Sequence, residues 1–252
     1  MPLINNQTWN FIATFAYDLF RLDSLILTAI AVSCLTSSIK AQHLVTVETI
    51  EIEYPLPSIH NFVISEDKFL LGTFDGLYHT NRERTTDQRT NGKRKGYSRD
   101  GEFIFSIDSL GRVFQSDEMQ LSLPKELIKN RTTVLLAKSN DKFFTCTVDP
   151  DKLSYSNAIY YFNQQGHSLF TYLVGIPSGL FADENYLWYL YQRSKPQAYG
   201  LLRKYHIQTR EMLLEMEIPV IEPVGLMIRS DSITTYSNQN RTFYTLKLKE
   251  DW

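Results

Sequence analysis

The chain has 252 residues, of which 43% are hydrophobic and 21% are charged, and its net charge at neutral pH is −2. This composition is that of a folded protein, and it excludes extensive disorder and any general attraction to nucleic acid or to anionic membranes. The length allows one large domain or two small ones, each with a substantial core.

The first 41 residues differ from the rest and have the order of an export signal. Arg21 precedes an apolar run at 25–32, and small and polar residues follow as far as Ala41. The run is shorter than the ~20 apolar residues of a transmembrane helix, whereas its length and flanks suit a secretory signal. We expect residues 1–41 to be an N-terminal extension plus export signal, with a buried N-terminal helix as the alternative. The mature domain is then 42–252, secreted or held in the periplasm or outer envelope.

The two cysteines bear on the route of export. Cys34 ends the segment "AVSC", which resembles a lipoprotein box, so a lipid anchor on Cys34 is the alternative to a cleaved, unanchored form. Membrane attachment is expected only in that case. Cys146 is the one cysteine after residue 42, which leaves it no partner for an internal disulfide. Its alternation with aromatic residues in "KFFTCTV" indicates a buried structural thiol.

From residue 43 onward the sequence predicts strands separated by turns. Short runs rich in Val, Ile, Tyr, Phe and Thr alternate with clusters of Gly, Asn, Asp and Pro, and no amphipathic helix stands out. The first strand lies in 43–57, and a change of its apolar phase near Glu48 predicts a β-bulge. Five repeats follow, each with an Asp-containing turn before an apolar or aromatic strand. The marker residues of these repeats are Asp67, Asp100, Asp141, Asp183 and Asp231.

Successive marker residues are 33, 41, 42 and 48 positions apart. Periods of about 40 to 50 with four short strands each are typical of β-propeller blades. In the fourth repeat the expected inner, second, third and outer strands lie in 179–185, 186–192, 199–208 and 211–219. The outer one alternates, and the apolar residues that share its expected inner face are Met212, Leu214, Met216 and Ile218.

The last repeat lacks an outer strand, whereas the strand in 43–57 lacks a blade. Pairing the two would close the ring and remove exposed sheet edges. We therefore expect an all-β protein, a β-propeller of five four-stranded blades that is closed by the N-terminal strand of the mature chain. A sixth blade concealed in 82–135 is one alternative, and a β-sandwich or jelly roll is another.

Short motifs add a resemblance to known propellers. "PSGLFADENYLW" (177–188) and "PVGLMIRSDSIT" (223–234) share Pro, Gly and Leu at the same offsets. A P-x-G-L segment followed by an Asp turn and a strand resembles NHL-type and related six-bladed propellers. "FLLGTFDGLYHT" (69–80) resembles the repeat of two-component-regulator propellers. In such a propeller, binding would use the loops on one face, which rigid blades hold in place.

One stretch, 82–99, is strongly basic. It holds seven Lys or Arg and two acidic residues, so the rest of the chain carries −7. A basic loop on an acidic body can steer an anionic partner; the alternative is a solvated loop that binds nothing. The candidate binding residues here are Arg82, Arg84, Arg89, Lys93, Arg94, Lys95 and Arg99. We expect no nucleic acid as partner, because the remaining surface would repel phosphates and the stretch lacks a pattern of alternating basic and aromatic residues.

Aromatic residues of the fourth repeat are the second candidate. Trp188 and Tyr191 offer area with a polar edge, which suits a sugar or a protein partner; the alternative is burial in the core. We find no catalytic nucleophile motif, phosphate loop or calcium loop, and the five histidines lack the spacing of metal ligands. No cofactor, metal site or catalytic residue is therefore predicted.

These observations favour an exported propeller that acts as a non-catalytic binding module for a protein or a glycan. One alternative is a propeller hydrolase or lyase with a metal in the axial channel. The other is a glycan-binding propeller with similar sites in each blade.

Overall fold

The computed structural model describes residues 43–52, 58–65, 68–73, 76–81, 85–87, 94–100, 103–115, 118–149, 157–173, 175–192 and 199–249. All of them belong to one compact unit, Gln42–Glu250. The expected export signal, the lipidation candidate Cys34 and the first marker residue, Asp67, lie outside the described residues.

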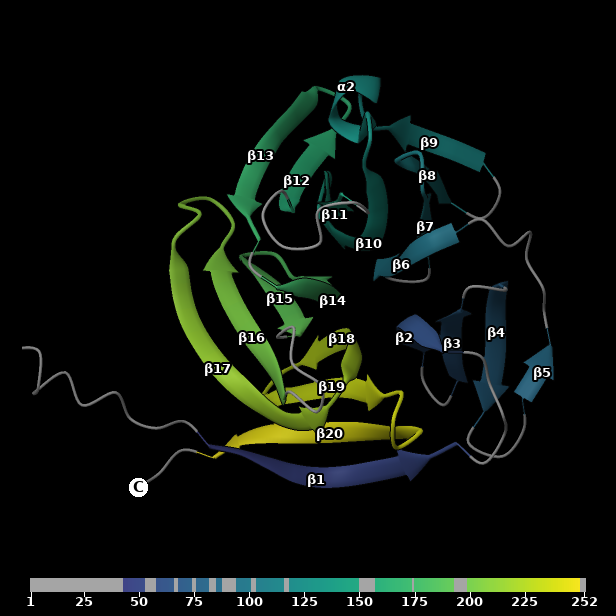
Figure 1. The fold of residues 1–252 in the computed structure, drawn as a ribbon, viewed down its shortest axis with the longest axis vertical. Helices are drawn as coiled ribbons and strands as arrows, with labels where there is room; N and C mark the ends of the chain where they lie inside the picture. Colours follow the sequence, from purple (N-terminus) through teal and green to yellow (C-terminus); the bar gives the residue numbers. More distant parts are fainter. Residues whose placement is uncertain are drawn as a thin grey trace, which may run out of the picture. The chain divides into compact units, whose positions relative to one another are not determined.

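Four sheets are each built from four consecutive antiparallel strands (Figure 1). The first has β2 (Ile59–Ser65), β3 (Lys68–Thr73), β4 (Gly76–Asn81) and β5 (Thr85–Asp87). The second has β6 (Arg94–Asp100), β7 (Phe103–Asp108), β8 (Arg112–Gln115) and β9 (Glu118–Ser122), and the short helix α2 (Lys125–Ile128) follows it. The third has β10 (Thr132–Ser139), β11 (Lys142–Val148), β12 (Ala158–Asn163) and β13 (Gly166–Tyr172). The fourth has β14 (Ile176–Ala182), β15 (Tyr186–Gln192), β16 (Tyr199–His206) and β17 (Met212–Ile221).

The fifth sheet joins the two ends of the described chain. Its order is β1-β20-β19-β18, from β1 (His43–Glu51), β18 (Pro223–Arg229), β19 (Ser232–Ser237) and β20 (Thr242–Lys249). β1 lies antiparallel alongside β20 (Figure 1), with His43 opposite Lys249 and Glu51 opposite Thr242. The register shifts between Thr46 and Glu48, which is where the change of apolar phase predicts a bulge.

The first strands of the five sheets contact one another in turn. β2 contacts β6, β6 contacts β10, β10 contacts β14, β14 contacts β18, and β18 contacts β2. Sheets of consecutive strands whose first strands meet in this way have a propeller-like arrangement, and the sandwich alternative is wrong. The segment 82–135 holds β5, β6–β9, α2 and the start of β10, and its described residues form no additional sheet.

We call these first strands the inner strands. Near its beginning, each has an irregularity in its pairing with the second strand of its sheet. The register to the second strand shifts between Ile59 and Asn61, Arg94 and Gly96, Thr133 and Leu135, Pro177 and Gly179, and Val224 and Met227. A bulge bends its strand and re-aims side chains. Its recurrence at one place in five strands is structural evidence of the repeat that the Asp-containing turns mark in the sequence, whereas the P-x-G-L motif occurs in only two of these strands.

The core lies between neighbouring sheets. Phe144 of β11 packs edge-on against Phe170 of β13, whose ring in turn packs edge-on against Tyr205 of β16 in the next sheet, at centroid distances of 5.6 and 5.8 Å. Cys146 is fully buried in the same cluster, and burial raises the pKa of its thiol. The prediction of a buried structural thiol is confirmed.

The fourth repeat follows the expected strand order. Its outer strand β17 buries Met216 and Ile218 and exposes Glu215, as the alternation predicts, but Met212 is 49% exposed. The Asp of its turn caps the backbone: the Asp183 carboxylate accepts hydrogen bonds from two backbone N–H groups of the turn, at 2.9 and 2.7 Å. This is the role that such turn residues usually have.

Candidate functional site

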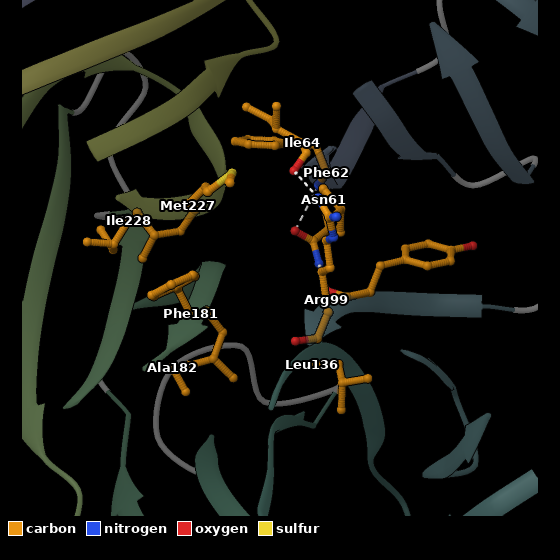
Figure 2. Close-up of a pocket in the computed structure, with 14 residues that line it drawn as sticks. Asn61, Phe62, Ile64, Arg99, Leu136, Phe181, Ala182, Met227 and Ile228 are labelled. Carbon is orange, nitrogen blue, oxygen red and sulfur yellow. Dashed lines mark hydrogen bonds between the residues drawn. The ribbon is translucent and has the colours of Figure 1, made fainter. Parts of the chain in front are cut away.

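A cavity of about 280 Å³ lies among the inner strands (Figure 2). All five of them line it, and we call it the axial cavity. Its residues are 61–64 of β2, 97–99 of β6, Leu136 of β10, 180–182 of β14 and 226–228 of β18. No single sheet could form this cavity, since residues from the first strands of all five sheets line it.

The axial cavity is apolar on one side. Figure 2 shows Phe181, Ala182, Met227 and Ile228 on the side opposite Asn61 and Arg99. These four side chains come from β14 and β18, where consecutive apolar residues follow the bulge. Apolar walls with a few placed polar groups are the usual composition of a small-molecule site.

Asn61 is the fixed polar group of the other side. Its Nδ2 donates to the Tyr97 carbonyl oxygen at 2.8 Å, and its Oδ1 accepts from the Phe62 backbone N–H at 2.8 Å. Asn61 is 2% exposed and ties β2 to β6. With these two bonds its amide serves mainly to hold the cavity wall in place.

Two guanidinium groups converge at the end of β2. The carbonyl oxygen of Ile64 accepts from Arg99 Nη1 at 3.2 Å and from Arg229 Nη2 at 3.4 Å. Arg99 itself lines the axial cavity, whereas Arg229 is exposed. A guanidinium has five N–H donors, and the Ile64 carbonyl oxygen is not the only partner of Arg99.

A second cavity, of about 290 Å³, lies where the inner strands begin. Its walls include Leu135, Pro177 and Val224, and the bulge residues His60 and Ser178 also line it. The buried Ser178 hydroxyl has no hydrogen-bond partner among the described residues. This cavity contains no Lys or Arg among its described lining residues.

The basic stretch 82–99 is divided rather than presented as one loop. Residues 94–100 form β6, an inner strand, so the expected loop is wrong for this part. Arg94 lies over the Phe114 ring, 3.2 Å from its centroid, and Arg99 lines the axial cavity. Lys95 lies in β6 at the bulge. Arg82, Arg84, Arg89 and Lys93 lie outside the described residues.

Trp188 and Tyr191 do not offer exposed faces. They are 7% and 4% exposed, because β15 is the second strand of its sheet and is covered on both faces. Tyr191 stacks on Tyr189 at a centroid distance of 5.4 Å, and its hydroxyl bonds Glu215 Oε2 at 3.1 Å. The interpretation of Trp188 and Tyr191 as a platform for a partner is therefore wrong, and their alternative reading as core residues holds.

The two stacked tyrosines predict opposite effects of losing a hydroxyl. Tyr189 is fully buried, and its hydroxyl has no hydrogen-bond partner among the described residues. We expect Tyr189→Phe to raise the free energy of unfolding by about 1 kcal/mol, because it removes an unsatisfied polar group. We expect Tyr191→Phe to lower it by about 1 kcal/mol, because it removes the bond to Glu215. Urea denaturation at neutral pH measures both, and a loss in Tyr189→Phe as large as that in Tyr191→Phe would contradict the assignment.

Tyr189 also makes the stability of the folded state depend on pH. Burial raises the pKa of Tyr189 well above its ordinary value, and the nearby Cys146 adds to the rise. The folded state therefore holds this proton more tightly than the unfolded state, whose tyrosine pKa is about 10. The stabilisation is complete below pH ~10 and falls as the pH rises further. Tyr189→Phe should reduce that alkaline loss of stability.

Other site types find no support in the described residues. Among them no three His, Cys, Asp or Glu side chains gather in a way that could hold a metal ion. No helix within the described ranges has the length and apolar character needed to cross a membrane.

Solved structures show the class of fold. Glutaminyl cyclase of Myxococcus xanthus matches with a TM-score of 0.58 and 10% identity, over 84% of this chain and 98% of that one. Regucalcin, a calcium-binding protein of Agrobacterium tumefaciens strain C58, matches with a TM-score of 0.52 and 8% identity, over 82% and 96%. The computationally designed Ika8 protein matches with a TM-score of 0.43 and 8% identity over 74% of this chain, which spans only 57% of that protein.

The strand topology and the matches to glutaminyl cyclase and regucalcin agree that the chain is a β-propeller. No protein-family model and no curated protein sequence matches the chain. Identities of 8% and 10% show a shared fold alone, so the activities named for the two matched proteins are theirs.

Proposed function

We propose that the protein is an exported, non-catalytic binding propeller whose axial cavity receives a small molecule with an apolar body and one anionic group. The observation that carries this proposal is the placement of Arg99 in a cavity whose opposite side is apolar. Export rests on the order of residues in 1–41, with cleavage after Ala41 or a lipid on Cys34 as its two routes.

The proposal includes a closed ring of five blades. The cyclic order of contacts among the inner strands, from β2 through β18 and back to β2, supports it. In this arrangement β1 is the outer strand of the last blade, because it pairs with β20 at the edge of that sheet. A closed ring turns the free edges of the inner strands toward the axis, where the neighbouring sheets protect them.

The charge of the ligand follows from Arg99. An anion in a mostly apolar cavity requires a charged hydrogen-bonding partner, since burying it unpaired is costly. Arg99 would supply that partner by sharing its guanidinium with the groups that it already contacts, and Arg229 would add positive charge at the same carbonyl oxygen. The basic residues Arg82, Arg84, Arg89, Lys93 and Lys95 would help by steering an anion toward an otherwise acidic body.

Calorimetry with octanoate and 1-octanol tests this proposal. The two probes share an apolar chain and differ in charge, so octanoate should bind and octanol should bind more weakly. In Arg99→Gln we expect affinity for octanoate to fall roughly tenfold to a hundredfold, the range for a lost charged hydrogen bond. Affinity for octanol should not change.

Arg210→Gln is the matched control, because the Arg210 guanidinium donates to the Leu169 carbonyl oxygen outside the axial cavity. It should bind both probes as the wild type does. Equal affinity of the wild type for the two probes, or an unchanged affinity of Arg99→Gln for octanoate, would refute the anionic ligand. Absence of binding for both probes would refute the cavity as a binding site.

A further inference from the structure

A third cavity, of about 390 Å³, lies between the second and third sheets. Two buried rings line it and form what we call its floor, Phe105 of β7 and Phe143 of β11, with centroids 5.3 Å apart. Lys138 Nζ lies over both rings, 5.2 and 5.8 Å from their centroids. We call it the amide groove, because most of its polar lining consists of carboxamide side chains. These are Gln115, Gln120, Asn140, Asn163, Gln164 and Gln165.

The amide groove is electrically neutral. One cation and one anion are among its lining residues, Lys138 and Asp141. The Lys138 ammonium forms an ion pair with Asp100 and also donates to the Asn140 carbonyl oxygen at 2.6 Å. Asp141 Oδ2 accepts from Asn163 Nδ2 at 2.8 Å. The Lys138 charge is thus paired within the protein, whereas the Asp141 carboxylate keeps its charge and is hydrogen-bonded by an amide. The two lining charges sum to zero, so the groove has no net attraction for an ion.

Part of the amide groove is held in a fixed geometry. Asn163 Oδ1 accepts from the backbone N–H groups of Gln165 and Gly166 at 2.9 and 3.2 Å. Its Nδ2 donates to Asp141, as above, and to Gln165 Oε1 at 3.3 Å. These bonds fix the turn between β12 and β13, which carries Gln164 and Gln165 at the groove. Binding therefore requires little ordering of the backbone there.

Carboxamides suit one kind of ligand in particular. Each carries an acceptor oxygen and two N–H donors in one plane, so it can both donate to and accept from hydroxyl groups. A neutral ring with several hydroxyl groups and apolar C–H faces matches such amides around a phenylalanine floor. A carboxylate could only accept from the amides and an ammonium could only donate to them, so each would satisfy one half of a carboxamide, and a purely apolar molecule would satisfy neither half.

We propose that the amide groove binds a neutral carbohydrate, with Gln115 and Gln164 bonding its hydroxyl groups from opposite sheets. This site is separate from the axial cavity and does not depend on the proposed anionic ligand. It also differs from the sequence-based alternative of similar glycan sites in each blade, because it lies between two sheets only.

Saturation-transfer NMR on the full chain tests the proposal. The probes are the methyl glycosides of glucose, galactose, mannose and N-acetylglucosamine. N-acetyl-tetraalanine amide serves as a neutral polar probe without hydroxyl groups. We expect transfer to at least one glycoside and none to the peptide. Gln115→Met and Gln164→Met keep the side-chain size and remove the amide, and each should weaken glycoside binding about fivefold.

Gln239→Met is the control, since Gln239 is exposed in the turn between β19 and β20 and does not line the groove. It should bind glycosides normally, and all three variants should bind octanoate as the wild type does, which separates this site from the axial cavity. Absence of transfer to every glycoside would overturn the proposal. Unchanged binding in both Gln115→Met and Gln164→Met, or transfer to the peptide as strong as to the glycosides, would also overturn it.

Discussion

Phe243→Ala should lower the free energy of unfolding by about 3–5 kcal/mol, the range for deleting a buried phenylalanine. Phe243 lies on β20 in the last sheet and is 2% exposed. Its ring packs against Phe62 of β2 and Phe69 of β3 in the first sheet, at centroid distances of 4.9 and 4.7 Å. It also contacts Tyr236 of its own sheet at 4.8 Å. The deletion therefore opens the contact between the last sheet and the first.

Urea denaturation followed by tryptophan fluorescence measures this loss. Tyr172→Ala is the matched control, because Tyr172 is an aromatic residue on β13 that is 68% exposed. It should change the stability by no more than about 0.5 kcal/mol. If Phe243→Ala were as mild as Tyr172→Ala, the first and last sheets would not be packed against each other in solution.

Gly225→Ala should have the second largest effect, a loss of about 2–5 kcal/mol. Gly225 lies in β18 with φ +66°, a region that costs other residues about 1–2 kcal/mol. A Cβ at this position would lie 2.4 Å from the Phe62 ring of β2, a clash that adds about 1–3 kcal/mol because the ring is itself packed. The glycine thus allows two neighbouring inner strands to approach.

Gly166→Ala separates the backbone strain of a positive φ from the steric clash of an added Cβ. Gly166 also has positive φ, at +153°, but a Cβ there would meet nothing within 4 Å. Its substitution should therefore cost less than that of Gly225, and thermal unfolding of the two variants side by side measures the difference. Equal losses would mean that the close approach of β18 to Phe62 does not occur.

The strand pattern was predictable from the sequence because it depends on local alternation. β17 buries Met216 and Ile218 and exposes Glu215, and a two-residue period predicts this directly. The pairing of β1 with β20 is predicted because the last repeat lacks an outer strand and the first strand lacks a blade. The bulge near Glu48 is predicted by a change in the alternation of apolar residues. Each of these inferences needs only neighbouring residues or a count of strands.

The site was less predictable, because it depends on which strand ends meet. Arg99 was one of seven basic candidates, and only the division of that stretch by β6 places it in the axial cavity. The cavity wall formed by Asn61 and the carbonyl oxygen of Ile64 carried no sequence signal, since its bonds join separate sheets. The prediction that Trp188 and Tyr191 bind a partner was wrong because aromatic content alone does not distinguish a covered strand from an exposed one.

The two proposed sites use different chemistry within one rigid scaffold. The axial cavity combines apolar walls with a guanidinium, and the amide groove combines neutral amides with a phenylalanine floor. Lys138 links the two regions: its backbone N–H donates to Ser98 Oγ at the axial cavity, and its side chain lines the amide groove.

A crystal structure of the protein grown with octanoate tests the central claim most directly. The account predicts the octanoate carboxylate within hydrogen-bonding distance of the Arg99 guanidinium, with the alkyl chain against Phe181, Met227 and Ile228. Octanoate bound elsewhere, or an axial cavity that holds only water beside Arg99 at saturating octanoate, would contradict it.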